Sequence, residues 1–289
     1  MSEKQRNLIV RTITGVLYVA IMVAGFLNPR AMVLLFCIIT GMTVWEYTGL
    51  VNDRVANVNV NRFISTVGAV YLNIAVAAWS VDYVRGFAVM LPYILTIVYL
   101  LISELYLKNK DAVTNMAYTM LAQMYIALPL SMINILAFKR DVNGDFSGID
   151  MLLPLSVFIL LWANDTGAYC CGSLFGKHKL FPRISPGKTW EGSIGGGIFA
   201  VIIAGVIGWL ANNGGPHTLN LYQWLGLGAV VVIFGTWGDL VESLFKRTLG
   251  VKDSGKILPG HGGMMDRFDS SLLAIPAAVI YLYSLTMFA

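Results

Sequence analysis

Long apolar runs, most of them about 18 residues or more, recur from one end of this 289-residue chain to the other. A run of that length crosses the roughly 30 Å hydrocarbon core of a bilayer as one α-helix, because each helical residue adds about 1.5 Å. Charged residues make up only 12% of the chain, against 57% hydrophobic residues. The sequence therefore predicts an all-α integral membrane protein.

The runs predict a polytopic bundle of about nine transmembrane helices. Their expected bounds are residues 8–27, 31–51, 63–81, 86–107, 112–138, 150–172, 189–211, 220–248 and 268–288. The fifth run is diluted by Asn115, Gln123 and Asn134, so we expect it to lie inside the bundle with its amides paired to neighbouring helices. Lys4 and Arg6 precede the first run as in a signal peptide, but no cleavage site follows, so this run is predicted to span the membrane.

The distribution of Lys and Arg predicts the orientation of the bundle. With the N-terminus in the cytoplasm, only Arg30, Arg85, Lys139 and Arg140 of the 20 Lys and Arg residues fall on the outer side. The positive-inside rule thus favours a cytoplasmic N-terminus, an outer C-terminus and a multi-pass location in the inner (cytoplasmic) membrane of the cell. The net charge of +4 is attributed to loops that face anionic headgroups, and no nucleic-acid partner is expected.

The two ends of the chain differ in their chemistry. Short connectors without a chemical motif join the first five predicted helices, whereas the later loops are dense in Gly, Pro, Lys and Asp. We therefore expect a scaffold region (1–145) and a catalytic region (146–289) within one helical bundle. No internal repeat relates the two regions.

The most informative polar stretch runs from Ser243 to Asp269 and reads SLFKRTLGVKDSGKILPGHGGMMDRFD. Ionisable groups are costly near a bilayer and indicate function by default. The stretch combines cations that can hold phosphates with carboxylates that can hold a hard metal ion: Lys246, Arg247, Lys252, Lys256 and Arg267, with Asp253, Asp266 and Asp269. This combination predicts a metal-assisted site for a nucleoside triphosphate.

The eighth predicted helix presents a polar face to this stretch. Its members are spaced at i, i+3, i+4 and i+7, and they are Asp239, Glu242, Ser243 and Lys246. Asp239 lies about 15 Å before the helix end, within hydrocarbon depth, and a carboxylate there needs a cation. That cation is either Lys246 or a bound metal, and a buried ion pair remains an open alternative.

Two more carboxylates can join Asp239. Asp266 and Asp269 are three residues apart at the start of the ninth helix, so they share a face and can point back toward Asp239. A few carboxylates beside phosphate oxygens are typical of Mg²⁺ sites. Helix capping by Asp266 is a second open reading, and it does not exclude metal binding.

A second polar constellation precedes the seventh helix. The sixth helix ends in Asn-Asp-Thr-Gly-Ala-Tyr, which includes Asp165, and the next motif, Ile-Ser-Pro-Gly-Lys-Thr, includes Ser185 and Lys188. Ser185 or Thr189 can cap the seventh helix, whose N-terminus offers amides to an anion. The Gly-Lys-Thr ending is not a P-loop, because neither the earlier glycine nor a preceding strand is present.

Two further residues are considered. His261 lies in a glycine-rich turn that can close over phosphates, and we expect it to be a ligand contact. Glu46 is a buried acid near the end of the second helix, where it either supports the site or acts as a hydrogen-bonded structural carboxyl. The sequence leaves these two roles of Glu46 open.

Both polar constellations resemble those of the integral-membrane phosphatidate cytidylyltransferases (CDP-diacylglycerol synthases). The shared pattern runs Ser-x-apolar-Lys-Arg, Lys-Asp, and His-Gly-Gly-apolar-x-Asp-Arg-apolar-Asp across residues 243–269. The Asn-Asp-Thr-Gly-Ala-Tyr and Ile-Ser-Pro-x-Lys-Thr motifs are similar as well. Gly187 stands where many family members carry a second Lys, which puts one phosphate contact in doubt.

The resemblance implies the reaction CTP + phosphatidate → CDP-diacylglycerol + pyrophosphate, a nucleotidyl transfer of phospholipid biosynthesis at the lipid bilayer. It assigns catalysis to Asp239, Lys246, Asp266 and Asp269, with Asp239, Asp266 and Asp269 as Mg²⁺ ligands. The substrate-binding residues are then Asp165, Ser185, Lys188, Arg247, Lys252, His261 and Arg267. A homodimer and a monovalent cation such as K⁺ are also implied.

Other functions remain open. A CTP-dependent enzyme acting on another lipid, such as an ether-lipid cytidylyltransferase or a polyprenol kinase, would use the same kinds of residues. An anion transporter would use buried charges as a pathway, but transporters usually carry such charges on two related halves. The polar motifs of this chain lie in one half only.

Overall fold

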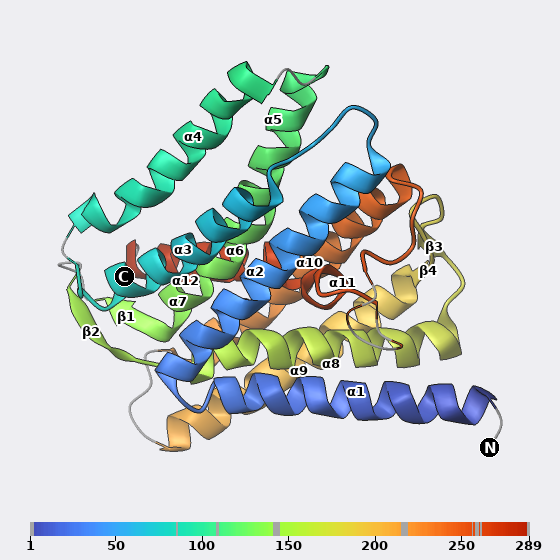
Figure 1. The fold of residues 1–289 in the computed structure, drawn as a ribbon. Coiled ribbons are helices and arrows are strands. Elements are labelled where there is room, and N and C mark those ends of the chain that lie inside the picture. The colour runs from blue at the N-terminus through green and yellow to red at the C-terminus, as the bar shows by residue number, and fades with distance from the viewer. Residues whose placement is uncertain are drawn as a thin grey trace. The chain divides into compact units, whose positions relative to one another are not determined.

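A computed structural model gives the structure of the chain and describes residues 3–84, 86–107, 110–140, 145–214, 219–255, 257, 260 and 262–287. Figure 1 shows a mostly helical fold with two short β-hairpins. In these described ranges, eight helices are long and apolar enough to cross a membrane. The 24-residue helix α8 occupies the remaining predicted position. The predicted all-α polytopic fold is confirmed, and the orientation of its termini stays a prediction.

Helices occupy all nine predicted positions in the described part of the chain. The first four positions are filled by α1 (Glu3–Gly25), α2 (Pro29–Arg54), α3 (Arg62–Ser80) and α4 (Leu91–Leu107), the last preceded by the 3₁₀ turn η1 (Gly86–Met90). The fifth comprises α5 (Ala112–Leu121), η2 (Ala122–Ala127), α6 (Leu128–Ser131) and α7 (Ile133–Ala137). The last four are α8 (Leu152–Phe175), α9 (Trp190–Gly214), α10 (Leu221–Thr248) and the pair α11 (Met265–Phe268) and α12 (Ser271–Met287).

Local sequence explains where helices begin. The Asn28 side chain precedes α2 and accepts a hydrogen bond from the backbone N of Arg30 at 2.9 Å, and Pro29 follows as the first helical residue. Asn61 caps α3 in the same way, accepting from the backbone N of Ile64 at 3.0 Å. Asparagine caps and an N-terminal proline satisfy or remove amide donors that a helix start leaves unpaired.

The polar residues of the fifth span are paired inside the bundle, as predicted. Gln123 donates from Nε2 to the backbone O of Ser65 at 2.9 Å, and Asn115 donates to the Glu104 carboxylate. Asn134 donates from Nδ2 to backbone and side-chain oxygens nearby. The π-helical segment η2 interrupts this span, a form of helix that often marks functional sites.

Two hairpins lie where the sequence predicted loops. Strands β1 (Phe138–Arg140) and β2 (Phe146–Ile149) pair antiparallel, and so do β3 (Lys179–Phe181) and β4 (Ser185–Thr189). These strands are three to five residues long, too short for an alternating apolar pattern to show. The second hairpin matters for function because β4 leads directly into α9.

The chain divides into two compact units. The first unit comprises Met1–Met151 and Thr248–Phe268, and the second comprises Leu152–Arg247 and Asp269–Ala289. In the first, α2 packs on α3; in the second, α8 packs on α9 (Figure 1). The polar segment after α10 thus packs with the N-terminal helices, and the fully buried Phe268 makes an edge contact with the ring of Phe36.

Candidate functional site

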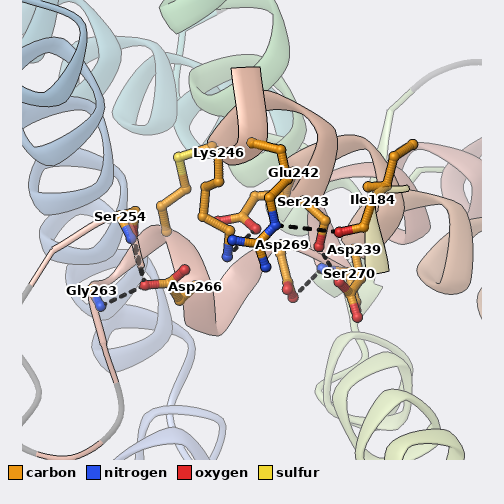
Figure 2. Close-up of polar contacts among 12 residues, drawn as sticks. Ile184, Asp239, Glu242, Ser243, Lys246, Ser254, Gly263, Asp266, Asp269 and Ser270 are labelled. Atoms are coloured by element: carbon orange, nitrogen blue, oxygen red, sulfur yellow. Dashed lines mark hydrogen bonds and ion pairs between the residues drawn. The ribbon is translucent and has the colours of Figure 1, made fainter. Parts of the chain in front are cut away.

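The second unit places a carboxylate, a hydroxyl and a lysine together beside the C-terminal half of α10. Ser243 donates from Oγ to Oδ1 of Asp239 at 3.1 Å, as Figure 2 shows. Lys188 of β4 forms an ion pair with Oδ2 of the same aspartate. The lysine that pairs with Asp239 is therefore Lys188, and not Lys246 as its shared helix face suggested. Both partners keep about a quarter of their side-chain surface exposed, at 27% and 26%.

Lys246 pairs instead with Glu242, one turn earlier on α10. Its Nζ lies 2.5 Å from Oε2 of Glu242, whose side chain is fully buried. Removing one partner of such a pair leaves an uncompensated buried charge, which is strongly destabilising. The pair gives α10 a fixed charge arrangement beside the site. The sequence placed Glu242 on the polar face but did not indicate this role.

Asp269 joins the cluster from the start of α12. Its carboxylate lies within electrostatic range of Asp239, Asp165 and Lys246. The approach of α12 to α10 depends on Gly238, since a Cβ there would lie 2.8 Å from the backbone O of Asp269. The backbone of Asp269 and Ser270 thus occupies the space beside this glycine.

The cap of α9 fixes the position of Lys188. Oγ1 of Thr189 accepts a hydrogen bond from the backbone N of Gly192 at 3.1 Å, so Thr189 is the capping residue and Ser185 is not. Arg247 at the end of α10 donates from Nε to the backbone O of Ile184 at 3.4 Å. These contacts tie both ends of strand β4 to the helices α9 and α10.

Glu191 closes the base of the same hairpin, and the sequence analysis missed it. Its carboxylate accepts hydrogen bonds from the backbone N atoms of Lys177 and His178, at 3.1 and 3.2 Å, and lies 2.5 Å from Nδ1 of His178. An acid in the first turn of α9 also complements the helix dipole. His178 and Glu191 are 13 residues apart in the sequence, on either side of the hairpin. No helical or strand periodicity relates two residues at that spacing, so only the folded hairpin reveals the contact.

In the first unit, Asp266 organises the polar segment around itself. Its Oδ2 accepts hydrogen bonds from the backbone N of Gly263 at 2.8 Å, and from the backbone N and Oγ of Ser254 at 2.9 and 3.0 Å (Figure 2). The bond from Gly263, three residues earlier, has the geometry of a local turn. Asp266 thus stabilises the fold of this segment by joining Ser254 to Gly263 through its carboxylate.

Glu46 holds the same segment from α2. Oε1 accepts from Oγ of Ser254 at 2.5 Å and from the backbone N of Met265 at 3.1 Å, and Oε2 accepts from the backbone N of Met264 at 2.9 Å. Only 8% of Glu46 is exposed. Gly263 leaves the room this carboxylate needs, because a Cβ there would lie 2.0 Å from Oε1. The open question about Glu46 is answered: it positions the polar segment.

The other predicted site residues are placed as follows. Lys252 and Asp165 are exposed, and Arg267 is half-buried. His261 and Lys256 lie outside the described residues. The structure therefore brings Asp239, Asp269 and Lys188 together in the second unit, while Asp266 belongs to the first.

The carboxylates of the second unit suit a hard cation that arrives with phosphates. Across the described ranges, no three His, Cys, Asp or Glu side chains form a group that could hold a metal by themselves. Mg²⁺ seldom needs one, since it is commonly bound through one or two carboxylates together with substrate phosphates and water. Asp239 and Asp269 supply that number of carboxylates.

Glu46→Gln is expected to loosen the polar segment. The amide of Gln cannot accept all the hydrogen bonds that the carboxylate accepts, and a bond to a charged acceptor contributes about 1.5–3 kcal/mol. Hydrogen exchange at Met264 and Met265 should become at least about 10-fold faster. The matched control is Glu104→Gln, a buried carboxyl of the first unit that bonds Asn115 instead. Equal exchange rates at these two amides in both variants would contradict the conclusion that Glu46 positions the polar segment.

The chain is similar to known proteins over nearly its whole length. The chain matches the cytidylyltransferase family over residues 9–285. It is 34% identical over 278 residues to a phosphatidate cytidylyltransferase of Staphylococcus haemolyticus, covering 94% of this chain and 98% of that protein. The protein of the same name from Staphylococcus aureus is 31% identical with the same coverage. That of Haemophilus influenzae is 45% identical over 141 residues, which cover 49% of this chain and 48% of the relative.

Proposed function

Because the chain belongs to the cytidylyltransferase family, we propose that it transfers the cytidylyl group of CTP to phosphatidate in the membrane. The products are CDP-diacylglycerol and pyrophosphate. One structural observation carries the proposal furthest: Asp239, Asp269 and Lys188 gather beside the C-terminal half of α10, an apolar helix. A site there can meet a water-soluble nucleotide and a lipid headgroup together.

The reaction needs alignment and charge neutralisation more than proton transfer. An oxygen of the phosphatidate phosphate bonds to the α-phosphorus of CTP, and the bond from that phosphorus to the bridging oxygen breaks. Pyrophosphate leaves with the electron pair. The attacking phosphate is already an anion at neutral pH, so no general base is required. Positioned cations and dipoles then supply most of the catalysis.

The residues divide this work between them. Lys188 is partly exposed and its amino group pairs with Asp239, so it can turn from the carboxylate to an incoming phosphate. Lys246 is locked to Glu242 and acts as a fixed charge. Thr189, Glu191 and Arg247 keep the hairpin in place, so that Lys188 stays beside α10.

The proposal includes Mg²⁺ at Asp239 and Asp269 of the second unit; Asp266, which belongs to the first unit, is a ligand in what the motif resemblance implies. Bound there with CTP, the ion would neutralise the triphosphate. The hard oxygen donors of the cluster support this choice. A second, monovalent cation such as K⁺, a homodimer, and a place in the inner membrane belong to the same proposal, in line with the family resemblance.

A reconstitution tests this function. Purified protein in detergent is supplied with CTP, phosphatidate and Mg²⁺, and the lipid product is identified by mass spectrometry. We expect CDP-diacylglycerol and an equal amount of pyrophosphate, with EDTA stopping the reaction and excess Mg²⁺ restoring it. Turnover of only an ether-linked analogue, or phosphorylation of a polyprenol, would indicate another lipid enzyme. Anion flux in proteoliposomes without a lipid product would indicate a transporter.

A further inference from the structure

An apolar groove runs along the second unit between α9 and α10. Its volume is about 480 Å³, within the roughly 300–1,000 Å³ of ligand sites. Apolar side chains line nearly all of it, among them Val201, Ile233 and Leu240, and strand β3 contributes Leu180 and Phe181 at one end. The groove is therefore apolar along its length, and strand β3 of the hairpin forms part of its wall.

The polar cluster continues the line of this groove. The α10 residues Ala229, Thr236 and Leu240 line it, and Ser243 follows them at the same helical spacing of three, four and seven residues. Ser243 is the residue that donates to Asp239 at 3.1 Å. Trp190, two residues after Lys188, lines the groove from α9. The apolar groove and the polar cluster therefore occupy neighbouring turns of α10.

The length of the groove fits one leaflet of a bilayer. Its lining on α9 extends from Trp190 to Ile202, which spans about 18 Å along a helix. Half of the hydrocarbon core of a bilayer is about 15 Å thick. The absence of a side chain at Gly197 keeps the floor open, since a Cβ there would already lie 3.2 Å from Cγ1 of Val232.

We infer that this groove holds one acyl chain of the lipid phosphate whose headgroup reacts at the polar cluster. The inference rests on the proposed function and adds the binding site of the lipid. The anionic headgroup complements the charge of Lys188. The acyl chain attached to it packs against the apolar groove, whose length is close to that of the chain. The groove then selects the lipid by the length of its chain.

Filling the far end of the groove tests this inference. Ala229 lies about 15 Å along α10 from Asp239, so Ala229→Phe blocks a long chain and spares an eight-carbon chain. We expect kcat/KM for dioleoyl phosphatidate to fall at least 10-fold and that for dioctanoyl phosphatidate to change less than 2-fold. The matched control is Val206→Phe, an exposed position of α9 outside the groove, which should affect neither substrate.

Each outcome decides a separate point. Equal effects of Ala229→Phe on both substrates, or no effect on either, would overturn the inference that the groove holds an acyl chain. Activity of the variant on dioctanoyl phosphatidate shows that it is folded. If the wild-type protein is inactive with both lipids, the proposed function is refuted, and not only the inference about the acyl chain.

A second measurement needs no substitution. A phosphatidate with a photoactivatable group at the end of one chain is bound to the wild-type protein and irradiated. Labelled peptides from residues 193–202 and 229–240, lost on competition with unlabelled phosphatidate, are expected. Labelling spread evenly over α1 and α4 would show that bulk lipid alone covers the groove, and would overturn the inference.

Discussion

Asp239→Asn should lower kcat by about 10³-fold while the protein remains folded. The substitution keeps the shape of the side chain and removes the charge that pairs with Lys188 and attracts a hard cation. Loss of one preorganised electrostatic contact at a reacting centre commonly costs about 10²–10³-fold in kcat. Steady-state kinetics at saturating Mg²⁺, with a thermal melt to verify folding, give the measurement.

The control for this variant is Asp53→Asn, an exposed carboxylate of α2, which should leave kcat unchanged. A kcat for Asp239→Asn within 10-fold of the wild type would rule out Asp239 as a member of the catalytic site. Asp269→Asn is expected to behave like Asp239→Asn, because the two carboxylates lie within electrostatic range of each other.

Lys188→Ala should lower kcat/KM by about 10²-fold, the second largest effect. It removes the cation nearest to Asp239 and leaves that carboxylate without its ion-pair partner. Lys188→Arg should recover part of the activity, because it keeps the positive charge. The matched control is Lys179→Ala, an exposed lysine of β3 in the same hairpin, for which we expect less than a 2-fold change.

A double-mutant cycle separates a shared role from two independent ones. If Lys188 and Asp239 act as one unit, the double variant Lys188→Ala/Asp239→Asn should be no slower than Asp239→Asn alone. If the losses of activity in the two single variants add up fully in the double variant, the two residues act independently and their ion pair does not contribute to catalysis. Lys246 is unsuitable for this test, because its removal would take the ion-pair partner from the buried Glu242 and would disturb folding.

The sequence predicted the helices well because length and hydropathy decide them. Runs long enough to span a bilayer have few alternatives to a helix, and asparagine and proline mark the starts of α2 and α3. The buried amides of Asn115 and Gln123 were paired as expected. The hairpins were missed, because strands of three to five residues leave no periodic pattern.

The site was predicted less completely, for a different reason. Helical spacing shows that Asp239 and Lys246 share a face, but not what lies across from it. The nearer Glu242 takes Lys246, and a strand far back in the chain supplies Lys188 to Asp239. Glu46 is more than 200 residues before the segment it holds, a distance over which sequence spacing carries no information.

The central claim is that this cluster drives cytidylyl transfer from CTP to a lipid phosphate. Its most direct test follows the phosphorus atoms of CTP, using purified protein, phosphatidate and Mg²⁺. Label in the α-phosphate should enter the lipid fraction, label in the γ-phosphate should appear in pyrophosphate, and Asp239→Asn should abolish both. Entry of the γ label into lipid, with the α label left in a soluble nucleotide, would contradict the account and indicate a lipid kinase.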